Sequence, residues 1–422
     1  MKKIILINHT FQIPRFYRRW ELFAREHPDM DVTLLTPSDF KWETSGSMIF
    51  GTDTSLKGVA VEHGNFRIVP VKTKNIKYLG WVSDDMVRYI REHQPDLVYH
   101  IGIHSQLSLI QCIRCVRRHV PGGKVVAFSM RGPALSLRLK KTRTNIAKWC
   151  ARLALYAMDW LKLQYFNRNC DAVLCHYPDA VKCFRDEGFK GPIYMSTQVG
   201  VNPEYYHPDE RQRREIRERL NLGDSFVFGA AARFIPSKGL FEIIDALPAD
   251  GDWKCLLMGK GTDEFTSAIG KRIADRGLED KIRLTGYIEW DEIAKYWNAI
   301  DCAIHVPQTT PEWEETFSVA VVQAMATAKP VIGNTSGSVP YQTGPDGVIV
   351  TEGDSDALAE AIRQMMTHPD EAKEIGDEMY RYATGNFSIQ HLNDQFYEIV
   401  NDILKGTYSQ DLVDMTKYRK GR

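Results

Sequence analysis

The sequence predicts an α/β protein built from two Rossmann-like lobes, and three observations support this class. Short β-branched runs alternate with segments of helical period, the alternation occurs twice along the chain, and Pro203 and Pro208 punctuate the stretch between the two series. Strands that alternate with helices form parallel sheets through right-handed crossovers. Each series is therefore expected to form one sheet that is covered by helices.

The first series lies in residues 1–200. Short apolar runs rich in β-branched residues predict its strands, and apolar residues spaced three and four apart predict its helices. The expected strands are 4–8, 31–35, 59–61, 66–71, 97–101 and 125–128, and the expected helices are 16–26, 84–93 and a long one over 145–166.

The second series lies in residues 201–385, and a final helix and a basic tail are expected in 386–422, after the breaker Gly385-Asn386. In two-lobe α/β proteins, ligands bind where the carboxyl ends of the strands face the cleft. The expected strands are 226–230, 254–258, 282–285, 302–305 and 330–332, and the expected helices are 240–246, 262–276, 290–297 and 318–327.

Length and composition exclude several classes of protein. The chain has 422 residues, of which 43% are apolar and 26% charged. A chain of this size buries enough apolar surface to be stable without disulfides. Its composition is not that of a disordered, collagen-like or disulfide-rich protein. No run of about 18 uncharged apolar residues occurs. The apolar start of the chain is too short for a signal peptide. A soluble, cytoplasmic protein is expected.

Cysteine usage points to a reducing compartment and to no metal site. The eight cysteines are scattered, and Cys112 and Cys115 form a single C-x-x-C within a helical pattern. A zinc site needs a second pair at matching spacing. Two core-facing thiols are therefore expected here.

The charges divide between the two halves. Residues 1–200 carry 30 Lys and Arg against 17 Asp and Glu, whereas residues 201–422 carry 24 against 37. No acid occurs between Asp96 and Asp159, while that stretch holds eleven Lys and Arg. Such asymmetry predicts an anionic partner for the first half. A second explanation, compatible with the first, is that the two lobes attract each other.

Two loops of the second lobe carry candidate site residues. Arg233 and Lys238 follow its first strand, where the planar guanidinium and the mobile ammonium could bind the two phosphates of a diphosphate from either side. Taken alone, an Arg and a Lys on a loop are more often solvent-exposed surface residues. Glu315 precedes an apolar, Ala-rich helix that contains Gln323. Free backbone N–H groups near residues 317–319 would form a seat for anionic or polyhydroxyl ligands.

A nicotinamide-dependent dehydrogenase is disfavoured. Neither lobe has a full G-x-G-x-x-G after its first strand, and Met258-Gly259-Lys260-Gly261 is only a fragment of that motif.

Taken together, these motifs resemble the retaining GT-B enzymes of glycosyltransferase family 4. The family's signature is an Arg and a Lys-Gly pair, followed by E-x-F-G-x4-E-A-M-A-x-G-x-P-V. This chain has Arg233, Lys238-Gly239 and then Glu315-Thr316-Phe317-Ser318-x4-Gln323-Ala324-Met325-Ala326. Weaker matches are Val199-Gly200-Val201-Asn202 with His207-Pro208, Met258-Gly259-Lys260-Gly261, Arg283-Leu284-Thr285-Gly286-Tyr287 and Gly347-Val348-Ile349-Val350. The resemblance covers essentially the whole second lobe and, loosely, the alternation of the first.

The resemblance implies a retaining, hexosyltransferase-like enzyme that uses no metal or other cofactor and takes a UDP- or GDP-sugar as donor. The implied catalytic residues are Arg233 and Lys238, which would bind the diphosphate, and Glu315, which would accept hydrogen bonds from the donor sugar. Gln323 stands where the family has a second Glu on the ribose diol, and an amide accepts one bond where a carboxylate accepts two. The other implied donor-binding positions are Phe317, Ser318, Val319, Gly286, Tyr287, Ile288 and Gly259.

The resemblance also implies the roles of the parts. Residues 1–200 would form the acceptor-side lobe, 201–385 the donor lobe, and 386–422 a crossing helix that packs back on the first lobe, with a basic tail. Many members carry a His after the strand that matches 125–128. Here Arg131 is the candidate in that place, and His104 is a second candidate, although a loop His is more often only solvent-exposed.

The basic first lobe suggests the acceptor. A lipid-linked, anionic intermediate of envelope polysaccharide biosynthesis would suit it, and the protein would then be peripheral at the inner face of the membrane; nucleic acid is disfavoured because the second lobe is acidic. The side chains of Trp149, Leu153, Tyr156 and Trp160 form a stripe at helical spacing, and such a stripe more often belongs to the core.

Two other functions stay open. One is a catalytically silent GT-B subunit, favoured by the missing His, Ser318 and Gln323, and the other is a nucleotide-sugar epimerase.

Overall fold

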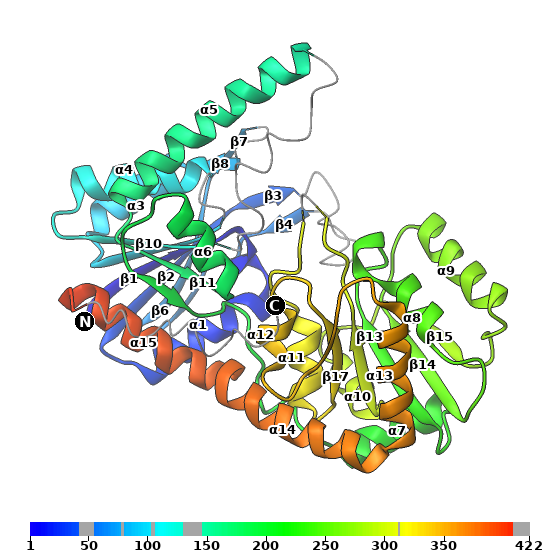
Figure 1. The fold of residues 1–422 in the computed structure, drawn as a ribbon. Coiled ribbons are helices and arrows are strands. Elements are labelled where there is room, and N and C mark those ends of the chain that lie inside the picture. The colour runs from blue at the N-terminus through cyan, green and yellow to red at the C-terminus, as the bar shows by residue number, and fades with distance from the viewer. Residues whose placement is uncertain (42–54, 77–79, 103–105, 130–145, 311–312, 408–422) are drawn as a thin grey trace. The chain divides into compact units, whose positions relative to one another are not determined.

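The computed structural model describes residues 1–41, 55–76, 80–102, 106–129, 146–310 and 313–407. The chain forms two compact units (Figure 1). The N-terminal unit comprises Met1–Gln198 together with Asn393–Arg422, and the C-terminal unit comprises Val199–Leu392.

The N-terminal unit is built on an eight-stranded sheet. Ile4 of the central strand pairs with Val32 on one side and with Leu97 on the other, both in parallel, whereas the edge pair is antiparallel. The order is β12(Ile193–Met195), β11(Ala172–Cys175), β10(Lys124–Phe128), β9(Leu97–Ile101), β1(Lys2–Ile7), β2(Met30–Pro37), β6(Phe66–Val71) and β5(Val61–His63). Chain order therefore reverses between β1 and β9, which is the topological switch point of this sheet.

Helices cover both faces of this sheet. Figure 1 shows the first and last helices on one face and α3 and α4 on the other. The helical elements are η1(His9–Gln12), α1(Pro14–Glu26), α3(Asp84–His93), α4(Leu107–His119), α5(Ile146–Asn169), α6(Pro178–Asp186) and α15(Ile389–Lys405). Two antiparallel ribbons that the sequence did not predict complete the unit: β3(Asp39–Lys41) with β4(Ser55–Lys57), and β7(Lys74–Ile76) with β8(Gly80–Val82).

The core of the N-terminal unit includes residues from both ends of the chain. Phe396 of α15 lies 4.9 Å from Trp20, 5.3 Å from Phe23 and 5.2 Å from Tyr99, measured between ring centroids. Arg19 of α1, almost fully buried, donates through Nε to Asn393 Oδ1 at 3.1 Å. The expected packing of the last helix on the first lobe is thus observed.

The C-terminal unit has a six-stranded, all-parallel sheet. Its order is β15(Ile282–Gly286), β14(Trp253–Met258), β13(Phe226–Ala231), β16(Cys302–His305), β17(Val331–Asn334) and β18(Val348–Val350). In chain order this is 3-2-1-4-5-6, the doubly wound Rossmann arrangement, so the switch point lies between β13 and β16. Two sheets, one parallel except for its edge strand β5 and one entirely parallel, confirm the predicted fold class.

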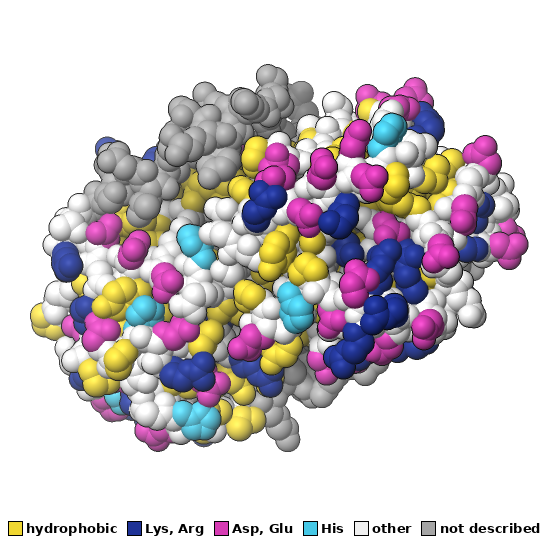
Figure 2. Space-filling view, turned by 90° about the horizontal axis from the view of Figure 1, so that it is seen from below, with side chains coloured by type: hydrophobic (Ala, Val, Ile, Leu, Met, Phe, Trp, Pro, Cys, Tyr) yellow, Lys and Arg dark blue, Asp and Glu magenta, His cyan; other side chains and the backbone are white. Residues whose placement is uncertain are grey.

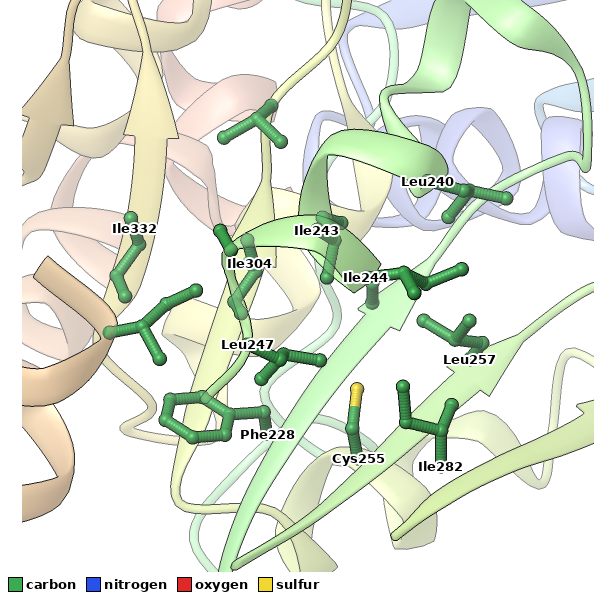
Figure 3. Close-up of a cluster of buried hydrophobic side chains, with 14 of the residues drawn as sticks. Phe228, Leu240, Ile243, Ile244, Leu247, Cys255, Leu257, Ile282, Ile304 and Ile332 are labelled. Carbon is green, nitrogen blue, oxygen red and sulfur yellow. The ribbon is translucent and has the colours of Figure 1, made fainter. Parts of the chain in front are cut away.

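Helices cover both faces of the second sheet as well. Figure 3 shows α8 side chains Leu240, Ile243 and Ile244 beside strand residues Leu257 and Ile304 in one buried cluster. A second cluster on the other face joins Trp297, Met325 and Phe387. The helical elements are α7(Glu210–Arg219), η3(Pro236–Lys238), α8(Leu240–Ala246), α9(Asp263–Asp275), α10(Ile293–Ala299), α11(Val319–Ala326), α12(Val339–Thr343), α13(Ser355–Thr367) and α14(Pro369–Phe387).

The predicted boundary at residue 385 falls inside a helix. α14 continues through Gly385 and Asn386 to Phe387, and Ser388 separates it from α15. The side-chain Nδ2 of Asn386 donates back to Tyr382 O at 2.8 Å. Gly385 has no atom near the place of a Cβ, so a small residue at an exposed helical position was mistaken for a stop signal.

Surface charges are mixed where they can be seen. Figure 2 shows one face on which Lys and Arg side chains are interspersed with Asp and Glu. Much of the acid-free stretch, including residues 130–145, lies outside the described residues. Among the helices the structure describes, none is long and apolar enough to cross a bilayer.

Candidate functional site

The candidate site of the C-terminal unit lies at the switch point of its sheet. Arg233 follows β13 by two residues, and His305 is the last residue of β16. Lys238 ends the short turn η3, and Gly239 begins the entry to α8. The two central strands therefore deliver three nitrogen-bearing side chains to one edge, where α/β sheets bind their ligands.

Gly239 seats the Lys238 loop against the end of β16. Its φ of 67° is in the left-handed region, and a Cβ there would lie 1.9 Å from the carbonyl oxygen of Val306. Only glycine permits such a conformation and such a close approach without strain. This explains the Lys-Gly pair physically: the glycine lets the lysine loop touch the strand that ends in His305.

Glu315 lies at the centre of a buried cluster. Its Oε2 is 2.5 Å from Lys238 Nζ and 3.2 Å from His305 Nε2. The exposed fractions of Glu315 and His305 are 5% and 6%. Lys238 Nζ also lies 4.7 Å from the centroid of the Trp313 ring, which is a favourable cation–π distance.

The cluster keeps Glu315 ionised. Burial by itself raises the pKa of this carboxyl, but the hydrogen bond to His305 and the charge of Lys238 outweigh it, and the pKa is lowered to about 2. An ionised carboxylate only accepts hydrogen bonds, so His305 Nε2 carries the proton. Both donors use Oε2, and within the described part of the chain no hydrogen bond reaches Oε1.

Arg233 lies on the same loop as Lys238, five residues before it. Its side chain is half-buried, and its guanidinium has no ion-pair partner among the described residues. The flanking backbone is fixed, because Ala232 N–H donates to Met258 O at 3.0 Å and Phe234 N–H donates to Lys260 O at 2.9 Å. A cation on a rigid loop at a sheet edge is available to an anionic ligand.

The same edge brings together the predicted base-binding residues. Gly259 N–H donates to Gly286 O at 2.9 Å, so the loops after β14 and β15 are adjacent. Lys260 Nζ lies 5.3 Å from the centroid of the Tyr287 ring. Tyr287 is 36% exposed and Ile288 is half-buried. Gly259, Gly286, Tyr287 and Ile288 therefore lie next to the Arg233 loop.

Gln323 is placed differently from the expectation of a ribose-binding side chain. It is 3% exposed on α11, its Oε1 accepts from Trp297 Nε1 at 3.3 Å, and its Nε2 donates to the Tyr206 hydroxyl at 2.8 Å. Both ends of the amide are thus engaged inside the unit.

One part of the predicted anion seat is wrong. The N–H of Ser318 is not free, because it donates to Gln342 Oε1 at 2.7 Å, and Ser318 O accepts from Gln342 Nε2 at 2.9 Å. Ser318 is also the N-cap of α11. Phe317 packs its ring 5.7 Å from that of Phe387, and Val319 begins the helix. The sequence around Ser318 could not reveal this bond, because the partner Gln342 is 24 residues further along the chain.

The backbone of Glu315 is fixed from the opposite side. Gly337 has a φ of 48°, and a Cβ there would lie 2.1 Å from Glu315 O. Ser338 N–H donates to that oxygen at 2.7 Å. The turn before α12 therefore holds the carboxylate-bearing loop, and it depends on glycine to do so.

The first-lobe candidates His104 and Arg131 lie outside the described residues. The structure instead shows two other histidines at the switch point of the N-terminal sheet. His9 follows β1, and burial lowers its pKa to about 4. His100 of β9 is 1% exposed and bonds through Nε2 to Ser108 Oγ at 3.0 Å, while its Nδ1 has no hydrogen-bond partner among the described residues. Burial, and then His9, lower its pKa to about 3.

The expected C-x-x-C thiols are confirmed as core residues. Cys112 and Cys115 are free and buried on α4, and burial raises both thiol pKa values. In the part of the chain that the structure describes, no group of three metal-binding side chains occurs.

The sequence of the C-terminal unit matches a known family. Residues 212–382 match the family model described as "Glycosyl transferases group 1". A GDP-mannose-dependent alpha-(1-6)-phosphatidylinositol monomannoside mannosyltransferase of Mycobacterium tuberculosis is 26% identical over 186 residues, which are 42% of this chain and 48% of that protein. The chain thus spans about half the length of such relatives. The capsular polysaccharide biosynthesis glycosyltransferase CapM of Staphylococcus aureus is 23% identical over 85% of this chain and 97% of CapM.

Solved structures share the whole fold. A sucrose-phosphate synthase from Thermosynechococcus elongatus has a TM-score of 0.69 and 17% identity, over 96% of this chain and all of that one. Anabaena HepE, in complex with UDP and glucose, has a TM-score of 0.65 and 17% identity, over 95% of this chain and all of that one. At this identity the likeness establishes the fold, which is GT-B. Over residues 212–382, the chain is similar to the glycosyl transferases group 1 family.

Proposed function

We propose that the chain is a retaining glycosyltransferase that moves a sugar from a nucleotide-sugar donor to an acceptor without a metal ion. The observation that carries this proposal is the Lys238–Glu315–His305 cluster, at the switch point of a sheet in the region that matches the glycosyl transferases group 1 model. Arg233, five residues before Lys238, has no ion-pair partner among the described residues. Such a site offers two cations for a diphosphate and one ionised carboxylate for sugar hydroxyls.

Each residue has a role in this reaction. Arg233 binds the diphosphate and stabilises the negative charge that develops on it as the bond to the sugar breaks. Glu315 Oε1 accepts hydrogen bonds from the donor sugar and fixes its orientation. Lys238 turns from Glu315 toward the phosphates. The departing phosphate takes the acceptor's proton on the face where the new bond forms, which needs no protein nucleophile.

The donor test uses nucleotides and one charge deletion. UDP, GDP, UDP-glucose and GDP-mannose are screened by thermal shift, and release of free nucleotide from the best donor is then followed. Arg233→Ala is expected to lower kcat/KM about 10²-fold or more, since a preorganised charge contributes several kcal/mol at the transition state. Arg363→Ala, which removes an exposed arginine on α13, is the matched control.

The outcomes separate the alternatives. Near-wild-type turnover of Arg233→Ala would show that the site is misassigned. A catalytically silent subunit would bind nucleotides poorly and release none from a nucleotide sugar. An epimerase would invert a stereocentre of the sugar without an acceptor, either while the sugar is still attached to the nucleotide or as it is released.

We further propose that the acceptor is an anionic, lipid-linked intermediate and that the N-terminal unit lies on the membrane to reach it. The basic first half supports this, as do the names of relatives that act on phosphatidylinositol mannosides or build lipopolysaccharide and capsule. α5 adds a physical reason. Trp160 is 47% exposed and Leu161 is 61% exposed, so this end of the stripe is not core, and such side chains bind membrane interfaces.

Liposome flotation tests the membrane proposal. The protein is expected to float with vesicles containing anionic lipid at low salt and to be released at high salt, because screening weakens the attraction. Trp160→Ser with Leu161→Ser should weaken flotation. Tyr205→Ser, at a side chain that is 56% exposed in the C-terminal unit, should not. Equal absence from anionic and neutral vesicles would favour a soluble acceptor.

A further inference from the structure

Two donors of different mobility hold one oxygen of Glu315. Lys238 Nζ and His305 Nε2 both contact Oε2. Lys238 is on a short loop turn and reaches the carboxylate through a flexible four-carbon chain. His305 is the last residue of β16, a strand paired on both sides, with β13 and with β17. Its ring is 6% exposed, so it has little freedom to move.

The two donors would face different demands during a reaction. In the proposed function, Lys238 turns toward the diphosphate, and this movement draws Nζ away from Oε2. Glu315 would then lose its shorter contact just when the sugar must be held. A carboxylate with no partner can rotate, and a misplaced group costs far more than one hydrogen bond in an oriented reaction.

We propose that His305 is a positioning residue, which keeps the Glu315 carboxylate in place so that Oε1 binds the donor sugar while Lys238 turns to the diphosphate. This inference rests on the proposed function and adds a residue that touches neither sugar nor phosphate. Its N–H provides the fixed hydrogen bond, and the strand end provides the rigidity.

The proposal predicts a split between two kinds of ligand. Loss of the His305 hydrogen bond affects the part of binding that depends on the sugar, because only the sugar contacts Glu315. The affinity for the free nucleoside diphosphate does not depend on this hydrogen bond. A residue that merely stabilises the fold would weaken both ligands alike.

Two amide variants test this with matched polarity. In His305→Gln, the amide N–H lies as many bonds from the backbone as Nε2 does and reaches Oε2. In His305→Asn, the N–H is one bond closer to the backbone and does not reach it. The affinities of wild type and both variants are measured by calorimetry for UDP, UDP-glucose, GDP and GDP-mannose, with melting temperatures to check the fold.

The expected result is specific to the sugar. Relative to wild type, His305→Asn should weaken the binding of the nucleotide sugar about tenfold, the scale of one hydrogen bond to a charged group. It should leave the matching free diphosphate within about twofold and raise the donor KM more than it lowers kcat. His305→Gln should restore most of the loss.

Other results would overturn the inference. An equal loss for sugar-bearing and free nucleotides, no loss in His305→Asn, or no rescue by His305→Gln would each show that His305 does not position Glu315. If the wild-type protein bound none of the four ligands, the proposed function itself would fail, and the inference would fail with it. These results differ, so the two failures can be told apart.

Discussion

Glu315 and Gln323 are both buried, but only Glu315 keeps an oxygen atom without a hydrogen bond from the described residues, whereas both ends of the Gln323 amide are bonded. The indole N–H of Trp297 can only donate, so it fixes which end of the Gln323 amide is oxygen. The amide nitrogen then must face the Tyr206 hydroxyl. Gln323 therefore ties α10 and α11 to the segment that holds Tyr206.

This geometry changes the expected effect of Gln323→Glu. A carboxylate accepts hydrogen bonds from both ribose hydroxyls where an amide accepts only one, so the sequence alone predicts that this variant binds the donor more tightly. In the structure, both carboxylate oxygens could still accept, from Trp297 and from a rotated Tyr206 hydroxyl, but burial at 3% exposure opposes the charge. We expect the free energy of unfolding to fall by about 1–3 kcal/mol, measured by urea unfolding. Gln390→Glu, at an exposed position of α15, should change it little. Unchanged stability with tighter donor binding would restore the ribose interpretation.

His100 makes the stability of the N-terminal unit depend on pH. Its pKa is about 3 in the folded state, chiefly through burial, against a normal value of 6.5. Below pH 6.5 the unfolded chain takes up a proton that the folded chain refuses, so stability falls as the pH drops toward 3. Between pH 7 and pH 5 this side chain should account for about 2 kcal/mol.

Urea unfolding of wild type and His100→Gln at both pH values measures this contribution. The variant should lose less stability than wild type on acidification, whatever its stability at pH 7. Parallel losses in the two proteins would show that His100 is not responsible.

Single residues also mark the limit of what the sequence can predict. Arg233, Lys238 and Glu315 are charged residues on loops after strands, and both their position and their resemblance to a family motif point to a site. His305 gives no such signal, because it closes an apolar strand and its partner is ten residues further along. His100 is hidden in the same way, within an entirely buried strand. Burial and a specific neighbour are properties of the fold.

At the scale of elements, the loop that carries Glu315 depends on the turn that faces it. Ser338 N–H and the missing side chain of Gly337 allow close contact with the Glu315 backbone. A substitution on this turn should therefore displace the Glu315 carboxylate, although Gly337 lies 22 residues after Glu315 in the chain.

Gly337→Ala tests this coupling. The new Cβ would lie 2.1 Å from Glu315 O, so the Glu315 loop must shift. We expect loss of most turnover, together with a stability loss greater than the 1–2 kcal/mol that an alanine in the left-handed region costs by itself. Gly277→Ala is the matched control, since φ there is 63° but no atom lies within 4 Å of the new Cβ. Gly277→Ala should lower the free energy of unfolding only by the cost of the backbone strain, and the variant should keep its activity. Equal effects of the two variants would contradict the coupling.

Elements with strong periodicity were predicted well, and short or edge elements were not. α3, α8, β9 and β16 have the bounds that the pattern predicts, because each is a single apolar run or stripe with clear stops. The ribbons β3–β4 and β7–β8 were missed, since strands of three residues carry too little alternation to recognise. The expected strand over 59–61 is observed as β5 at Val61–His63, an exposed edge strand whose register is set by pairing with β6.

At the scale of the whole molecule, the N-terminal unit is completed by the far end of the chain. Phe396, Ile399, Val400 and Ile403 of α15 are almost fully buried in the core of that unit. Sequence periodicity could locate the helix, but only the resemblance indicated which lobe it packs on. A helix's own pattern shows that one face is buried and says nothing of the partner.

Phe396→Ala measures the importance of this contact. Because Phe396 packs against Trp20, Phe23 and Tyr99, its truncation should lower the free energy of unfolding by about 3–5 kcal/mol. Hydrogen exchange should locate the loss in the N-terminal unit. Glu398→Ala, on the exposed side of the same helix, should change stability by less than about 0.5 kcal/mol. A loss confined to the C-terminal unit would contradict the assignment of α15.

The position of α15 also has a consequence for synthesis. A ribosome makes Met1–Gln198 first, yet the sheet of that unit lacks its last covering helix until residue 405 has been translated. At roughly 5–20 residues per second, the nascent unit exposes an apolar surface for on the order of ten seconds or more. Meanwhile the intervening Val199–Leu392 can fold on its own contacts. The first unit to leave the ribosome is therefore the last to be completed, and its apolar surface stays accessible to chaperones during that interval.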